Sequence, residues 1–326
     1  MDDRHATDEF DVGIKQTAGG GESTLTVLIA LGANVLVAIA KSVAAVITAS
    51  ASLVAEAAHS WADAGNEVFL FIADKRSRRP PDKAHPLGYG RAAYVWSLFA
   101  ALGLFVAGAA VSIWHGIQEL IHPEPASDFL IGYIVLAISF VLEGISFLQS
   151  VRQARAEASA YDRELLEHVL ATSDPTLRAV FAEDAAALTG LVIAGGALGL
   201  HQLTGSSTPD SIGSILVGLV LGVVAVILIQ RNVGFLVGEQ VSPQVRAAAL
   251  RALQSEPDVA SVSYLRLEYV GPRQVYLVAD VDLTGDHAEH EVAAELERLE
   301  RRITASRGVA GAILSLSAPD QQPLVD

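Results

Sequence analysis

Four polar residues recur at intervals of three and four in an otherwise apolar stretch of this sequence. Glu56, His59, Asp63 and Asn66 all lie in "AEAAHSWADAGNEVFLFIAD". In an α-helix these intervals place the four side chains on one face, with His59 and Asp63 about 6 Å apart along the axis. An imidazole and a carboxylate in this arrangement are ligands that a divalent metal ion such as Zn²⁺ accepts. The same residues also allow a hydrogen-bond network between helices.

A second polar group, "FAEDAAALTG", interrupts a later apolar segment. Glu183 and Asp184 are adjacent, so in a helix they point about 100° apart and do not face the same partner. Small residues follow Asp184 and permit close helix packing, so we expect Asp184 rather than Glu183 to meet the first polar helix. Glu143 in "SFVLEGISF" is a lone acid at a similar depth, and Lys41 is a base that either neutralises an acid or reaches an interface.

Long apolar segments carry all of these residues. The chain has 326 residues, 51% of them hydrophobic and 18% charged, and a mean hydropathy of +0.40. Each apolar block is long enough for a helix that crosses a bilayer, which needs ~20 residues. The blocks cover about 25–48, 51–73, 94–120, 128–150, 177–201 and 211–236. We therefore expect an α-helical membrane protein with six transmembrane helices.

Lys and Arg residues are distributed asymmetrically between the predicted loops. The loops near 49–51, 121–128 and 201–210 contain none, whereas "DKRSRRPPDKAHPLGYGR" and the segment between spans four and five are rich in them. This places both termini in the cytoplasm, and Ala- and Arg-rich usage favours a bacterial inner membrane. A formal net charge of −15 argues against nucleic acid as a partner. The absence of cysteine excludes thiolate metal sites and disulfides.

The sequence divides into four parts. We expect a disordered cytoplasmic tail at 1–22, a six-helix transmembrane domain at 23–238, a cytoplasmic domain at 239–318 and a short tail at 319–326. The third part alternates helical and strand patterns in the order α-β-β-α-β, which is typical of a ferredoxin-like α+β domain. At about 75 residues its core is thin, so we expect it to pair with a second copy in a homodimer.

Several of these motifs together resemble the cation diffusion facilitator family. "HSWAD", "DKAHPLGYGR", the Asp of span five and the C-terminal α-β-β-α-β pattern carry the resemblance, which extends from about residue 24 to 318. It implies a six-span homodimer that exports Zn²⁺ or related ions from the cytoplasm in exchange for protons. The family takes two transport ligands from span two and two from span five, each pair spaced by four. His59, Asp63 and Asp184 match this pattern, but the remaining position is Val180.

The fourth ligand of such a site is therefore open between Glu183, Glu143, Asn66 and water. Imidazole with carboxylates favours Zn²⁺ over Mn²⁺, which prefers oxygen ligands. Co²⁺, Fe²⁺ and Cd²⁺ remain open as transported ions, and no prosthetic group is expected.

The resemblance also implies two sites outside the membrane. In the loop after span two, Asp82 and His85 match the family pattern, whereas Tyr89 stands where a further His is often found. A weak metal site and a purely structural loop are equally compatible with these residues. In the C-terminal domain, His287 and His290 lack the polar partners expected on the last strand, so we expect that domain to dimerise and to bind metal poorly.

The mechanism implied is alternating access. Metal binding needs a neutral imidazole and ionised carboxylates, so protons compete for the same atoms. Two other classes of protein have similar features. A membrane metal sensor would signal through the cytoplasmic domain, and an intramembrane metal hydrolase would need a motif such as H-E-x-x-H, which the sequence lacks.

Overall fold

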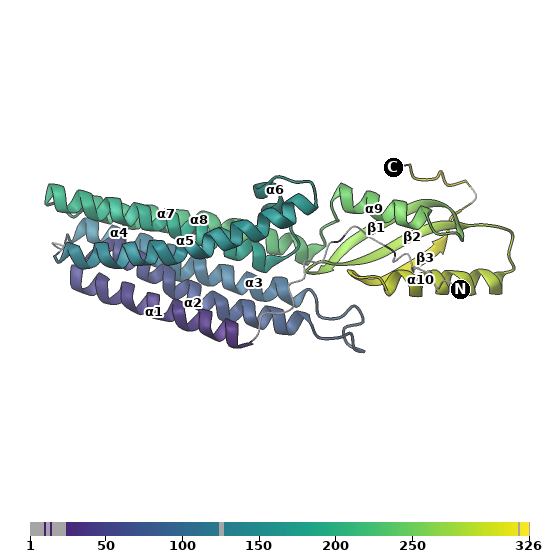
Figure 1. Cartoon of the computed structure of the whole chain (residues 1–326), viewed down its shortest axis with the longest axis horizontal. Helices are drawn as coiled ribbons and strands as arrows, with labels where there is room; N and C mark the ends of the chain where they lie inside the picture. Colours follow the sequence, from purple (N-terminus) through teal and green to yellow (C-terminus); the bar gives the residue numbers. More distant parts are fainter. Residues whose placement is uncertain (1–9, 11–13, 15–23, 124–126, 319, 326) are drawn as a thin grey trace, which may run out of the picture. The chain divides into compact units, whose positions relative to one another are not determined.

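The computed structural model describes residues 10, 14, 24–123, 127–318 and 320–325. These residues form two compact units (Figure 1). The helical unit comprises Gly20–Arg76 and Ala92–Val233, and the α/β unit comprises Met1–Gly19, Ser77–Arg91 and Gly234–Asp326. Most of the predicted tail at 1–22 lies outside the described residues, but Phe10 and Ile14 are buried. In the predicted tail at 319–326, the described residues 320–325 form no helix or strand.

Long helices lying side by side make up the helical unit. Their bounds are α1 (Thr24–Thr48), α2 (Ala51–Ser77), α5 (Phe129–Ala160), α7 (Pro175–Thr204) and α8 (Thr208–Val237), and the short α6 spans Leu165–Ala171. Five segments are long and apolar enough to cross a membrane: Leu31–Thr48, Ala92–Ile121, Phe129–Ala160, Pro175–Thr204 and Thr208–Val237. The mostly helical membrane fold is therefore confirmed. That α2 is the sixth span stays a prediction, because its polar face makes this 27-residue helix less apolar than the others.

The third predicted span is one continuous helical run with an irregular centre. It consists of α3 (Ala92–Gly103), a π-helical stretch η1 (Leu104–Ala110) and α4 (Val111–Ile121). A π turn holds more residues than an α turn and so rotates the faces that follow it. Within the stretch, Gly108 packs against α8, where an added Cβ would lie 3.1 Å from Leu221 Cδ1. The sequence pattern did not predict this irregularity.

Two buried polar networks join helices of this unit, one at each end of the helices. Asp210, in the first turn of α8, accepts hydrogen bonds from the Ala51 backbone N–H at 2.7 Å and from Ser50 Oγ at 3.0 Å. Its carboxylate therefore caps the N-terminus of α2. At the other end of the helices, Arg178 of α7 donates to Thr172 O at 2.9 Å and to Asn232 Oδ1 of α8 at 2.8 Å.

The α/β unit confirms the predicted order α-β-β-α-β. Its elements are α9 (Pro243–Gln254), β1 (Val259–Gly271), β2 (Gln274–Leu283), α10 (Glu289–Thr304) and β3 (Val309–Leu316). The sheet has the order β1-β2-β3, with β1 antiparallel and β3 parallel to β2. The parallel pair requires a crossover, which α10 supplies. Alternate residues of β2, among them Leu277 and Ala279, are fully buried and form the core of the unit.

We predict that Gly218→Ala in α8 destabilises the helical unit. A Cβ at this position would lie 2.7 Å from Ile113 Cγ1 and 2.9 Å from the Ala109 carbonyl oxygen, so α8 would have to move away from α4. Overpacking of this kind costs about 1–3 kcal/mol, and it should lower the melting temperature followed by circular dichroism in detergent. Gly195→Ala in α7 is the matched control, because an added Cβ meets nothing within 4 Å there. Equal melting shifts in the two variants would contradict the close packing of α4 and α8.

Candidate metal site

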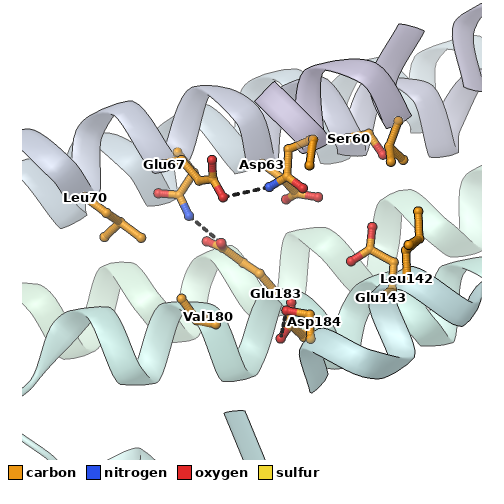
Figure 2. Close-up of a pocket in the computed structure, with 14 residues that line it drawn as sticks. Ser60, Asp63, Glu67, Leu70, Leu142, Glu143, Val180, Glu183 and Asp184 are labelled. Carbon is orange, nitrogen blue, oxygen red and sulfur yellow. Dashed lines mark hydrogen bonds between the residues drawn. The ribbon is translucent and has the colours of Figure 1, made fainter. Parts of the chain in front are cut away.

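A cavity of about 270 Å³ lies within the helical unit between α1, α2, α5 and α7 (Figure 2). Carboxylates dominate its lining: Asp63, Glu67, Glu143, Glu183 and Asp184. Its other lining residues are Ala33, Asn34, Val37, Ser60, Asn66, Leu70, Leu142, Ser146 and Val180. Among the described lining residues there is no Lys, Arg or His. Such a concentration of acidic groups attracts cations.

The polar face of α2 is buried as its helical spacing predicted. Glu56 and His59 are fully buried, and Asn66 is 2% exposed. His59 Nδ1 lies 3.3 Å from Asp63 Oδ1, so the predicted pair comes together. Asp63 lines the cavity, whereas His59 is not among the lining residues and sits beside it. Neither ring nitrogen of His59 has a hydrogen-bond partner among the described residues.

Glu183 and Asp184 have contacts that are the reverse of the sequence expectation. Asn66 Nδ2 donates to Glu183 Oε2, so Glu183 is the acid that meets α2. Asp184 instead accepts from Ser146 Oγ of α5 at 3.0 Å. Figure 2 shows Glu183 extended toward α2, with Asp184 on a different face of α7. The 100° step between adjacent residues was anticipated, but the position of α5 beside α7 decides which acid faces which helix.

Glu143 lines the same cavity from α5. Ser146, one turn further along α5, donates to Asp184, so this part of α5 lies against α7. The cavity therefore brings Glu143, Asp63 and Asp184 to one region, although they are far apart in the sequence. In the described part of the chain, no three His, Asp or Glu side chains are close enough to hold a metal ion in this conformation.

Lys41 neutralises one acid rather than reaching an interface. Its Nζ lies 3.0 Å from Glu56 Oε2, and both side chains are fully buried. A side chain at Gly190 of α7 would collide with Glu56, so this glycine makes room for the ion pair. Glu56 is consequently engaged in a structural pair and does not line the cavity.

Asn34 and Glu67 are cavity residues that the sequence analysis did not select. Asn34 Nδ2 of α1 donates to Glu67 Oε1 of α2 at 2.8 Å, and both residues line the cavity. An asparagine within the apolar "LGANVLV" was the available sequence evidence. It pointed to no partner, because the pairing is between helices.

The loop Ser77–Arg91 places Asp82 and His85 together in the α/β unit. His85 Nδ1 lies 3.5 Å from Asp82 Oδ1, and both side chains are about half exposed. Tyr89 donates its hydroxyl to Asp82 Oδ2 at 2.8 Å. This hydrogen bond, together with those from the His85 and Ala84 backbone N–H groups, lowers the pKa of Asp82. Tyr89 therefore orders the loop at the position where a further ligand was expected.

His287, which precedes α10, lies near an acid of that helix. His287 Nε2 is 2.8 Å from the Thr284 carbonyl oxygen and 3.7 Å from Glu295 Oε2. Ser317, directly after β3, forms a hydrogen bond with Ser263 at 2.7 Å. Poor metal binding by this unit stays a prediction.

Comparison with known proteins gives one consistent result. The family model for the cation efflux transmembrane domain matches residues 27–237. A proton-coupled zinc antiporter of mitochondria from Xenopus laevis is 37% identical over 79% of this chain, and metal tolerance protein C4 of Arabidopsis thaliana is 36% identical over 72%. The aligned regions cover 46% and 51% of those proteins, so the chain spans about half the length of these curated relatives. An uncharacterized transporter of Methanocaldococcus jannaschii is 23% identical over 76% of this chain and 81% of its own length.

We predict that Lys41→Met strongly destabilises the protein. The substitution leaves Glu56 buried without its partner, which typically costs about 3–5 kcal/mol. The double variant Lys41→Met, Glu56→Met removes both charges and should recover most of the lost melting temperature. Equal losses in the single and double variants would show that the ion pair is not what holds these helices.

Proposed function

The chain belongs to the cation efflux family of membrane transporters, also known as cation diffusion facilitators. From this premise we propose that it exports divalent metal ions, zinc first among them, from the cytoplasm. The observation that carries the proposal is the acidic cavity in the helical unit. Five carboxylates line it, and the described lining residues include no cationic side chain; the acids are Asp63, Glu67, Glu143, Glu183 and Asp184. The relatives whose names include zinc or metal tolerance support this choice of cargo.

Members of this family are transporters rather than enzymes. A hydrolase is therefore no longer an alternative for this chain. A metal sensor that signals through the α/β unit differs from a transporter in moving no ions. Zinc flux into sealed vesicles separates the two, since a sensor would give none above the level of empty vesicles.

For the transport site we propose His59 and Asp63 of α2, Asp184 of α7 and Glu143 of α5 as ligands. His59 and Asp63 are already in contact. Glu143 lines the same cavity as Asp63 and Asp184, which supports it as the fourth ligand in place of Val180. Asn66 and Glu183 are engaged with each other, which makes them weaker candidates for this position. In this proposal a cation draws the three acids toward His59.

Proton exchange follows from the chemistry of these ligands. His59 must be neutral and the carboxylates ionised before metal binds, so each proton that they take up weakens the site. We propose that the site opens alternately to the two sides of the membrane, and that protons entering from outside displace the metal there. The same groups then carry both ions, and a separate proton path is not required.

The remaining features of the proposal concern the assembly and the membrane. We propose a homodimer formed through the α/β unit, whose three-stranded sheet makes a small core. The Lys and Arg distribution supports cytoplasmic termini. For the membrane we propose a bacterial inner membrane on composition, although the zinc antiporters among the relatives carry mitochondrial names.

We predict that Asp63→Ala abolishes zinc transport while leaving a folded protein. The change removes one metal ligand and the only described acid in contact with His59, so zinc flux in reconstituted vesicles should fall at least ~10-fold. Glu297→Ala, an exposed acid of α10, is a control for loss of a carboxylate elsewhere. Near-normal flux in the Asp63 variant would remove this site assignment.

We also predict that Glu143→Gln weakens zinc binding by about 10-fold or more, because an amide is a poorer metal ligand than a carboxylate. Isothermal titration of the purified protein gives the affinity, and vesicle flux gives the activity. If both stay at wild-type values, Glu143 is not the fourth ligand of the transport site.

A further inference from the structure

The cavity contains a second group of oxygen donors at a different depth from His59. Glu67 follows His59 by eight residues, which is about 12 Å along α2. An ion held by the His59 imidazole therefore lies beyond the reach of Glu67, whereas Asp63 is midway between them. Glu67 is on the side of α2 toward Lys75 and Arg76, the basic last turn of the helix. With the proposed orientation, this is the cytoplasmic side.

Three helices contribute side chains to this second group. Asn34 of α1 holds Glu67 of α2 through a hydrogen bond of 2.8 Å, and Asn66 of α2 holds Glu183 of α7. In each pair the amide uses its N–H to fix a carboxylate and keeps its own oxygen for another partner. Asn66 and Glu67 are consecutive residues of α2 and all four residues line the cavity, so the two pairs lie close to each other.

Two buried oxygens of this group have no hydrogen-bond donor. Asn66 is 2% exposed and Glu183 is 8% exposed, and both line the cavity. Within the described residues, Asn66 Oδ1 and Glu183 Oε1 lack a partner. Buried oxygens of this kind are costly unless something positive or a proton donor meets them. Their position on a cavity wall means that a cation entering the cavity can do so.

We propose that Asn34, Asn66, Glu67 and Glu183 form a second cation site, which receives a divalent ion from the cytoplasm before it passes by way of Asp63 to the transport site. The inference rests on the proposed export function. Amide and carboxylate oxygens accept hard or partly hydrated divalent ions, including Mn²⁺. Selection for zinc would then occur at the next step, where His59 supplies nitrogen.

Two divalent ions about 6–12 Å apart in a poorly solvated cavity repel each other strongly. The entry site and the transport site therefore hold one ion in turn rather than two at once. This arrangement gives a moving ion a ligand at each depth, and it keeps each site weak enough to release its ion.

The test uses Mn²⁺ with the full-length protein in detergent, in a His59→Ala background that removes the imidazole of the transport site. Electron paramagnetic resonance counts free Mn²⁺, and electron spin echo modulation reports any bound nitrogen. We expect one Mn²⁺ to bind without nitrogen coupling, which also excludes binding at His85, His287 or His290. Adding Glu67→Gln should weaken this binding by about 10-fold or more, because the site loses charge.

Asn34→Asp is the complementary variant, because it adds a carboxylate to the same site. It should strengthen Mn²⁺ binding in the His59→Ala background, a gain that misfolding cannot imitate. Mn²⁺ affinity that neither Glu67→Gln nor Asn34→Asp alters, or bound Mn²⁺ with nitrogen coupling, would overturn the entry site.

Zinc flux by the wild-type protein separates this proposal from the proposed function. Mn²⁺ binding as described without any wild-type zinc flux would retain the cation site and remove the export function. Normal zinc flux with Mn²⁺ affinity unaffected in both variants would remove the entry site alone.

Discussion

Charged groups among apolar helices need partners, and this constraint organises the helical unit. Moving an unpaired charge out of water costs several kcal/mol or more. Lys41 accordingly faces Glu56, Arg178 donates to Thr172 and Asn232, and Asp210 caps the N-terminus of α2. At the cavity, by contrast, amides bond to Glu67 and Glu183, a hydroxyl bonds to Asp184, and a histidine lies beside Asp63. The unit therefore compensates its structural charges internally and leaves a negative cavity for a cation.

The helix that carries the polar face, α2, has polar contacts with three other helices. Asn34 and Lys41 of α1 bond to Glu67 and Glu56, Glu183 of α7 bonds to Asn66, and Asp210 of α8 caps the first turn. Two of these contacts, Asn34 with Glu67 and Asn66 with Glu183, lie on the wall of the cavity, where water or an ion can replace a partner. Under the proposed alternating access, α2 would shift as ions bind, and replaceable contacts of this kind would allow that shift.

Features that depend on spacing within one helix could be predicted from the sequence. His59 and Asp63 come together because they are four residues apart, and the α-β-β-α-β order follows from local patterns of apolar and polar residues. Features that depend on contacts between helices could not. Asn34 of α1 bonds to Glu67, and α5, which packs beside α7, bonds to Asp184 and leaves Glu183 to meet α2. The periodicity of a single segment does not contain that information. The π-helical stretch Leu104–Ala110 was missed for a similar reason, because its packing partner Leu221 lies on α8.

Val180 gives the cavity an additional property. It lines the wall at the position where the family resemblance would place a ligand, one helical turn from Asp184. Because Val180 is apolar, the metal-ligating atoms among the described lining residues are oxygens. The imidazole of His59 lies outside this lining. Oxygen donors discriminate weakly among divalent ions, whereas nitrogen favours zinc and its neighbours in the first transition row. In the proposed transport site, discrimination would then fall to His59, so admission to the cavity would depend on charge and selection on one ligand of different chemistry.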